Sequence, residues 1–240
     1  MNSGRSIKLR GEGDEHELGT ILGRLKDRGC SVLVTGKAPI TAFRAASRRL
    51  FGHPEERRER VFIRLRPTNS LEEWFPADVD FDHRGVRIVD CTAPVRSTVE
   101  DGSDFEDLRW NPKVDPTEVS ALTRRSDVDG CTDEIDAAVA GAGPLVPAQL
   151  RVGLYSLGVL DGPDEMIDVV STVSSTVTAH RGMVHYHLQR PPTNGTARTL
   201  LEHVDAMLTL RKDVPEEPPL QKWTVPGYGE SPWVPLQRDR

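Results

Sequence analysis

The residues best placed to do chemistry form one short loop between a buried apolar run and a helical pattern. The loop runs from Gly36 to Ala42 and reads GKAPITA. A phosphate-binding loop reads G-x-x-x-x-G-K-[ST], because consecutive backbone N–H groups surround the phosphates while the lysine and the hydroxyl bind phosphate and Mg²⁺. Here no second glycine follows Gly36, Pro39 lacks an N–H, and Lys37 comes too early. Two interpretations stay open: a residual anion site made by Lys37, Thr41 and the helix N-terminus, or a plain strand-to-helix turn.

Asp90 is the second candidate, because it ends an apolar run and could replace a missing metal-binding carboxylate. A strand-end aspartate can equally cap the next turn. Even with ATP and Mg²⁺ bound, the chain would lack an obvious base or water-positioning group. The candidate cofactor-binding residues are therefore Gly36, Lys37, Thr41 and Asp90, and the sequence assigns no catalytic residue and no metal site.

Two histidines form a weaker candidate. His185 and His187 alternate on one predicted strand and so face the same way, a geometry that zinc can use. A third ligand, such as His180 or Cys91, would have to come from elsewhere, and no spacing supports it. Histidines packed between a sheet and a helix are the favoured interpretation.

Composition narrows the classes of partner and compartment. A net charge of -6 argues against nucleic acid. Three cysteines outside any C-x-x-C motif indicate reduced core thiols. The chain has no apolar leader and no run of about eighteen apolar residues, so we expect a cytoplasmic protein without a membrane span. A protein partner or self-association is the expected interaction.

The elements that must position these residues alternate along the chain. Apolar, β-branched runs predict strands at 31–35, 61–65, 86–91, 150–157, 183–188, 206–211 and 220–225. Helical periodicity predicts helices at 15–28, 41–51, 133–141, 163–181 and 197–204. The acidic stretch 98–130 is expected to be a surface excursion with a short helix at 117–124.

This alternation predicts an α/β fold with one mostly parallel central sheet, helices on both faces, and an antiparallel C-terminal strand pair. We expect a flexible N-terminus at 1–13, a single domain at 14–225, and a proline-rich tail at 226–240 without regular structure. Trp233 in that tail is expected to dock onto its own domain.

The order of strands over residues 18–225 resembles the KaiC branch of the RecA-like ATPases, in particular a degenerate haloarchaeal group without an intact Walker A motif. That resemblance implies a RecA/KaiC-like fold, and it exposes two further departures. Tyr155 stands where the Walker B acid belongs, and Arg66-Pro67-Thr68 stands where the family places a catalytic glutamate. The sequence therefore predicts a non-catalytic RecA/KaiC-like domain acting as a regulatory or protein-interaction module. The alternative is a nucleotide-binding protein or weak ATPase with an atypical phosphate loop.

Overall fold

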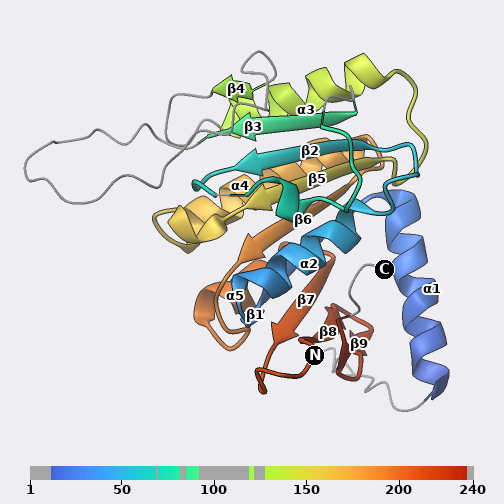
Figure 1. Ribbon diagram of the computed structural model, residues 1–240, viewed down its shortest axis with the longest axis vertical. Helices are drawn as coiled ribbons and strands as arrows, with labels where there is room; N and C mark the ends of the chain where they lie inside the picture. Colours follow the sequence, from blue (N-terminus) through green and yellow to red (C-terminus); the bar gives the residue numbers. More distant parts are fainter. Residues whose placement is uncertain (1–11, 69, 82–84, 92–118, 122–127, 237–240) are drawn as a thin grey trace, which may run out of the picture.

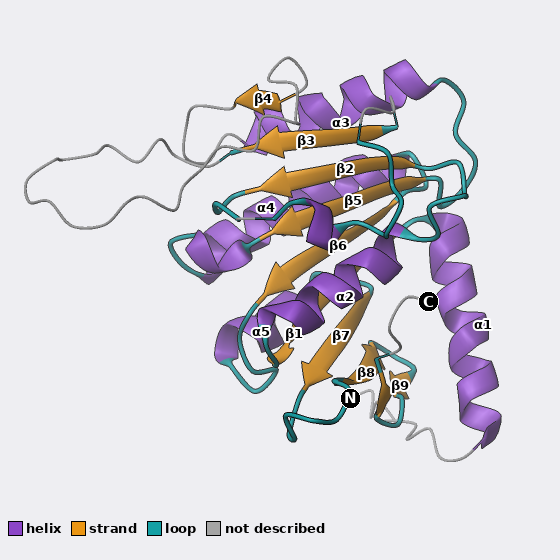
Figure 2. Cartoon of the chain, in the orientation of Figure 1, coloured by secondary structure: helices purple, strands orange, loops and turns teal. Residues whose placement is uncertain are grey.

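A computed structural model describes residues 12–68, 70–81, 85–91, 119–121 and 128–236 (Figure 1). Its helices are α1 (Glu12–Arg28), α2 (Ile40–Phe51), α3 (Val128–Ala142), α4 (Pro163–Ala179) and α5 (Gly195–Leu201), with short 3-10 turns η1 (Glu72–Trp74) and η2 (Leu157–Val159). Its strands are β1 (Cys30–Lys37), β2 (Glu59–Arg64), β3 (Val86–Asp90), β4 (Val119–Ala121), β5 (Leu150–Tyr155), β6 (Met183–Leu188), β7 (Ala206–Arg211), β8 (Leu220–Val225), β9 (Gly229–Glu230) and β10 (Val234–Pro235). Figure 2 shows the strands side by side in one twisted sheet.

The strands of the described residues pair in the order β10-β8-β7-β1-β6-β5-β2-β3-β4, and β9 also pairs with β8. Pairing is parallel from β7 through β4 and antiparallel where β8 meets β7, β9 and β10. The predicted α/β class, the mostly parallel sheet and the antiparallel C-terminal pair are thereby confirmed.

Helices cover both faces of the sheet (Figure 1). One core joins α3, α4 and α5 to the sheet, and it includes Ile135, Val170 and Leu200. The other core joins α1, α2 and η1 to the opposite face, and it includes Leu25 and Phe43. Each helix presents one apolar stripe to the sheet, which is the arrangement that its sequence periodicity requires.

The central strand β1 is buried on both sides because its side chains alternate between the two cores. Leu33 belongs to the core with α4, whereas Val32 and Val34 belong to the core with α2. All three side chains are almost completely buried. A continuous β-branched run is what a parallel strand between two helix layers needs.

Three expectations require correction. The tail was expected to be irregular, but β9 and β10 pair with β8. Residues 119–121 form β4 rather than the middle of a helix, because they find a parallel partner in β3. The first helix begins at Glu12, inside the segment expected to be flexible. Most of 98–130, and the rest of 1–13, lie outside the described residues.

Trp233 docks onto its own domain, as predicted. The Arg211 guanidinium lies 4.3 Å and the Lys222 ammonium 5.4 Å from the centre of its ring. Both distances are within the range of cation–π attraction. The indole thus fixes the C-terminal segment against β7 and β8.

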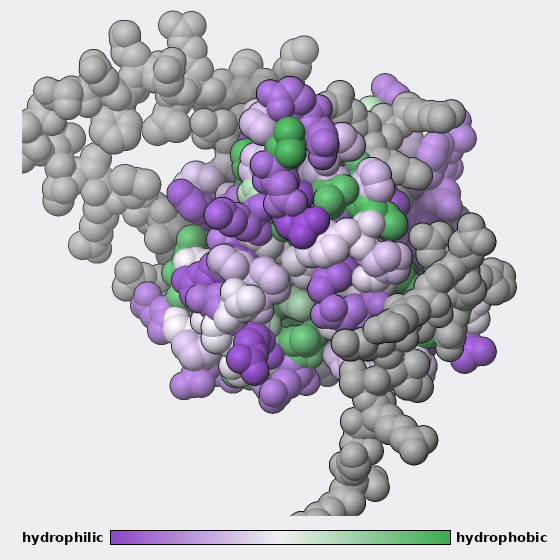
Figure 3. Space-filling model, turned by 90° about the horizontal axis from the view of Figure 1, so that it is seen from below, coloured by the Kyte–Doolittle hydropathy of each residue, from purple (hydrophilic) through white to green (hydrophobic). Residues whose placement is uncertain are grey.

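The face seen in Figure 3 is mostly hydrophilic, with apolar side chains in small separate groups. The large apolar side chains that are exposed, Val146, Val159, Val214 and Tyr228, are scattered along the described chain. No helix in the described segments is long and apolar enough to span a bilayer.

Candidate functional site

The predicted nucleotide site lies at the carboxyl edge of the sheet, where ligands of open α/β folds bind. The strand β1 is followed by α2 on one face, and β6 is followed by α5 on the other, so the connections diverge between these two strands. Gly36 and Lys37 end β1, and Thr41 is the second residue of α2. These three predicted residues are therefore brought together at the divergence point.

Asp90 is not brought to the same point. It ends β3, and the strands β6, β5 and β2 lie between β1 and β3. With neighbouring strands about 4.8 Å apart, the ends of β1 and β3 are roughly 19 Å apart across the sheet. A single Mg²⁺–phosphate unit cannot be held by Lys37 and Asp90 together, so the four predicted residues do not form one site.

Asp90 instead forms an ion pair with Arg64 on the neighbouring strand β2. Both side chains are less than one-fifth exposed. The pair neutralises the carboxylate within the sheet edge, which is a structural role at this position.

The connection between β1 and α2 is short. Only Ala38 and Pro39 lie between the last strand residue and the first helical residue. In the phosphate-loop pattern the hydroxyl stands seven residues after the first glycine, whereas Thr41 stands five after Gly36. The loop therefore has too little backbone to surround a phosphate in the usual way.

The backbone groups of this loop are partly committed to the protein itself. Gly36 N–H donates to the Arg190 carbonyl oxygen at 2.8 Å, and Ala42 N–H donates to the Pro39 carbonyl oxygen at 2.9 Å. Gly36 has φ +140°, and a Cβ added there would lie 1.9 Å from the Leu210 carbonyl oxygen. Close approach to β7 thus explains this glycine without a ligand.

Lys37 and Thr41 are exposed beside the first turn of α2. The residue preceding the helix, Pro39, supplies no side-chain cap, so the N-terminus of α2 has no capping side chain. An exposed lysine and hydroxyl beside a helix N-terminus are the features that the predicted anion site requires.

An aromatic cluster surrounds Tyr155, the last residue of β5. Tyr155 is 6% exposed, and its ring centre lies 4.4 Å from that of Trp74 and 6.4 Å from that of His187. Trp74 Nε1 donates to Thr68 Oγ1 at 3.1 Å. Trp74 therefore contacts both Tyr155, at the end of β5, and Thr68, in the loop after β2.

Trp74 was missed by the sequence reasoning. It lies in η1, which packs on α2 through an ion pair between Glu73 and Arg44. A buried tryptophan in a one-turn element produces no periodic pattern. The available signal was the adjacent aromatic pair Trp74-Phe75 inside a polar segment.

His185 and His187 are completely buried between β6 and α2, as the favoured interpretation predicted. His185 Nε2 lies 3.1 Å from Ser47 Oγ, whereas neither ring nitrogen of His187 has a hydrogen-bond partner in the described part of the chain. Burial lowers the pKa of His187 to about 3, and burial together with His187 lowers the pKa of His185 well below 6.5. Both rings are therefore neutral core side chains.

The third zinc ligand is absent from this position. His180 contacts Asp136, and Cys91 Sγ lies 3.2 Å from Cys131 Sγ. Within the described ranges no three His, Cys, Asp or Glu side chains are grouped so that they could hold a metal ion.

The fold and this edge together define a class of protein: an α/β domain with a mostly parallel sheet, in which aromatic side chains pack around the carboxyl end of β5. Residues 29–210 match the model of a family of unknown function, DUF7504, and the chain belongs to that family. The matched region runs from the start of β1 into β7 and so includes the whole carboxyl edge. No curated protein matches the chain.

Proposed function

We propose that this chain is a non-catalytic RecA/KaiC-like domain that serves as a regulatory or protein-interaction module. The observation that carries the proposal is the two-residue connection between β1 and α2, which leaves too little backbone to wrap a phosphate. A domain that keeps its sheet and helices but cannot hold a triphosphate is suited to binding rather than turnover.

Two further observations support the same proposal. Tyr155 packs on Trp74 in a buried cluster, so a phenol and an indole stand where a Mg²⁺-binding carboxylate is needed. Asp90, the nearest substitute by sequence, is paired with Arg64 and lies several strands from Lys37. Nothing among these residues supplies a base for an attacking water.

The alternative function is nucleotide binding through an atypical loop. Its support is the exposure of Lys37 and Thr41 beside the uncapped N-terminus of α2. A lysine and a hydroxyl at a helix N-terminus can bind a phosphate weakly. This alternative predicts binding through the β- or γ-phosphate without hydrolysis.

A titration with nucleotide separates the two. The full chain is titrated calorimetrically with ATP and with ADP, with and without Mg²⁺, and phosphate release is followed in parallel. We expect no saturable heat at millimolar nucleotide and no release above the buffer rate. Saturable binding that is lost in Lys37→Ala would establish the alternative. Hydrolysis that is lost in Lys37→Ala or Asp90→Asn would overturn the proposal.

The mode of interaction needs its own measurement. Light scattering coupled to size-exclusion chromatography gives the mass of the chain in solution across a range of concentrations. A mass above 26.6 kDa that rises with concentration supports self-association. A constant monomer mass would exclude self-association over that range of concentrations.

A further inference from the structure

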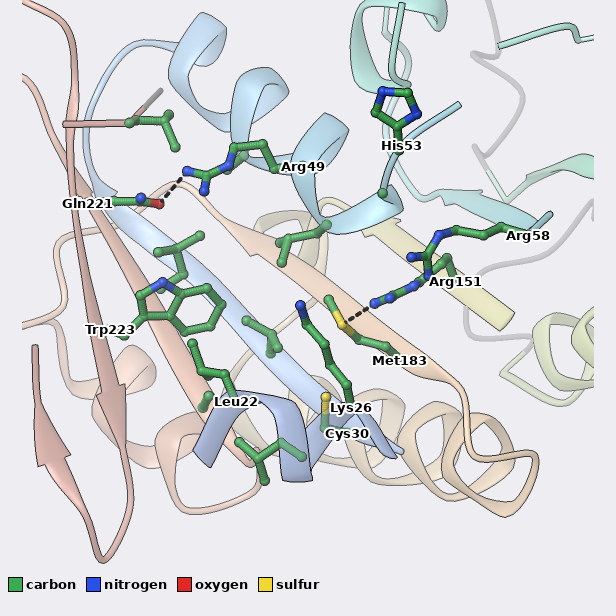
Figure 4. A pocket seen from close by; sticks show the side chains of 18 of the residues that line it. Leu22, Lys26, Cys30, Arg49, His53, Arg58, Arg151, Met183, Gln221 and Trp223 are labelled. Carbon is green, nitrogen blue, oxygen red and sulfur yellow. Dashed lines mark hydrogen bonds between the residues drawn. The ribbon is translucent and has the colours of Figure 1, made fainter. Parts of the chain in front are cut away.

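A cavity of about 420 Å³ opens at the amino-terminal edge of the sheet, opposite the predicted nucleotide site (Figure 4). It lies between α1, the C-terminal half of α2, and the first residues of β1, β5, β6 and β7. Volumes of this size hold small organic ligands.

The floor of the cavity contains an arginine without a carboxylate partner. The Arg151 side chain is 97% buried, since only 3% of its surface is exposed. Its Nη1 contacts the Met183 sulfur, and its Nε has no partner in the described part of the chain. A thioether is a weak acceptor, so the guanidinium charge is buried almost without compensation.

The other arginines near the cavity are satisfied. Arg58 is paired with Glu56 and donates to the Ala148 carbonyl oxygen at 2.7 Å. Arg49 donates to the amide oxygen of Gln221 at 3.2 Å. The one carboxylate among the lining residues, Glu56, is thus paired with Arg58 and offsets the Arg151 charge only from a distance, without a direct hydrogen bond.

A second cation converges on the same space. Lys26 extends from α1 toward Arg151 in Figure 4, and the one carboxylate among the lining residues, Glu56, is paired with Arg58. Partial burial and the neighbouring Arg151 charge lower the pKa of Lys26. Burial and the Arg58 charge likewise lower the pKa of Arg151 to about 10. Two cations that converge on one partly buried space favour an anion there, because an opposite charge stabilises the charged form of both side chains.

Much of the remaining lining is apolar, although Arg49 and Gln221 also line the cavity on the side of Trp223 (Figure 4). Trp223 and Leu22 face the cavity from the side opposite Arg151 (Figure 4). The aliphatic lining is completed by Leu25, Val32, Leu50, Leu208 and Leu236. A ligand that fits this cavity therefore needs an anionic head at one end and an apolar body at the other.

We propose that the cavity binds a small amphiphile with one anionic headgroup, a carboxylate or a phosphate monoester, whose head pairs with Arg151 and Lys26 and whose apolar chain lies against Leu22 and Trp223. This site is separate from the carboxyl edge and so goes beyond the function proposed above. Its test uses no nucleotide, so the two proposals can fail independently.

The test is a calorimetric titration of the full chain with octanoate and with octyl phosphate. Octan-1-ol has the same chain without charge, and acetate and inorganic phosphate carry the charge without the chain. We expect saturable binding of at least one of the charged octyl compounds. The alcohol and the two small anions are expected to bind at least roughly tenfold more weakly.

Arg151→Met is the decisive variant, because methionine keeps much of the side-chain length and removes the charge. We expect octyl-anion affinity to fall roughly tenfold or more, since a charge-assisted bidentate contact is lost. We also expect the unliganded variant to melt at a higher temperature than the parent, because a buried charge without a direct carboxylate partner is replaced by an apolar group.

Arg60→Met is the matched control. Arg60 is also a buried strand arginine, 5% exposed, but it donates to the His53 carbonyl oxygen at 2.8 Å and does not line the cavity. This variant should lose stability and keep its affinity. Lys26→Gln, an exposed position that does not threaten folding, should weaken binding a few-fold.

Three results would overturn the proposal. The first is the absence of saturable binding for both charged octyl compounds. The second is equal affinity for octan-1-ol and octanoate, which would make the cavity merely apolar. The third is unchanged affinity in both Arg151→Met and Lys26→Gln, which would place the bound anion elsewhere.

Discussion

The backbone N–H of Gly36 donates to the carbonyl oxygen of Arg190 at 2.8 Å, and the Thr35 hydroxyl donates to the same oxygen at 2.5 Å. These bonds join the ends of β1 and β6 at the point where their following helices diverge to opposite faces. A crevice at this divergence is where open α/β sheets bind ligands. In this chain the two hydrogen bonds to the Arg190 carbonyl oxygen hold the ends of β1 and β6 together at that place.

Gly36→Ala is expected to destabilise the fold whether or not nucleotide is present. An added Cβ would lie 1.9 Å from the Leu210 carbonyl oxygen, so main-chain atoms of β7 would have to move. The free energy of unfolding should fall by more than about 3 kcal/mol, or the chain should fail to fold. Chemical denaturation monitored by circular dichroism measures this change.

Lys37→Ala and Thr41→Ala are the comparison for that experiment. Both side chains are exposed and belong to the same loop region. Each substitution should change the unfolding free energy by no more than about 0.5 kcal/mol. A Gly36→Ala variant as stable as these two would show that β7 does not approach β1 as closely as described.

Acid should weaken the fold through His185 and His187. Burial lowers the pKa of His187 to about 3 and that of His185 well below 6.5. Below pH 6.5 these two side chains therefore bind protons in the unfolded chain but not in the folded chain. The unfolding free energy therefore decreases as pH falls below 6.5, by up to roughly 1.4 kcal/mol per pH unit for each histidine. Urea denaturation between about pH 7.5 and about pH 5 gives the slope.

His187→Leu should reduce the slope of unfolding free energy against pH, because it removes one of the two histidines that bind a proton only in the unfolded chain. The variant should also be no less stable than the parent at neutral pH, because a side chain whose two buried nitrogens lack partners becomes apolar. His203→Leu, at an exposed position, should leave the slope nearly unchanged. Parallel pH curves for the parent and His187→Leu would contradict the burial of this ring.

Gly153→Ala should cost about 1–3 kcal/mol of stability. A Cβ at Gly153 would lie 2.7 Å from Phe51 Cζ and 2.8 Å from His185 Nε2. Both rings are completely buried, so neither can move away from the added Cβ without displacing its own neighbours. Gly19→Ala in α1 is the control, because its Cβ meets nothing within 4 Å and alanine favours a helix by up to about 1 kcal/mol. Thermal unfolding should therefore move in opposite directions for the two variants.

Cys91 and Cys131 should form a disulfide under mild oxidation. Their sulfur atoms lie 3.2 Å apart, and Cys91 is partly exposed. Diamide can take up the two thiol hydrogens and leave the S–S bond, which mass spectrometry of an unreduced digest detects. Cys30 should stay reduced, because burial and the Asp205 charge raise its pKa to about 12. Cross-linking that persists in Cys91→Ser would rule out this pair.

The sequence predicted the core strands well because their patterns are local. The apolar runs at 183–188, 206–211 and 220–225 coincide with β6, β7 and β8. The strands β6 and β7 are almost wholly buried, so apolar residues dominate them, whereas the partly buried β8 is recognisable by its apolar, aromatic and β-branched residues. The two-residue strands β9 and β10 have no such pattern, since they exist only through pairing with β8.

The candidate sites were harder to predict because they depend on strand order. The departure of the Gly36 loop from the phosphate-loop pattern could be predicted from residue spacing. The distance between Lys37 and Asp90 could not, because the strands β6, β5 and β2 lie between β1 and β3, and this order depends on pairing between segments far apart in the sequence. Arg151 looked like an ordinary polar residue between apolar neighbours. Its missing partner becomes evident only when α1 and β6 are placed around it.

The outer side of β8 determines whether copies of this chain can associate by adding strands to this edge of the sheet. β9 pairs with Thr224 and Val225, and β10 pairs with Leu220 and Gln221, so both ends of that strand are already hydrogen-bonded. Pro235, within β10, offers no N–H to a newcomer. Trp233, which lies between β9 and β10 in the sequence, packs against the cationic groups of Arg211 and Lys222. The short strands β9 and β10 therefore protect this edge of the sheet from pairing with further chains, the process that leads to fibrils. An unpaired β8 would lack that protection.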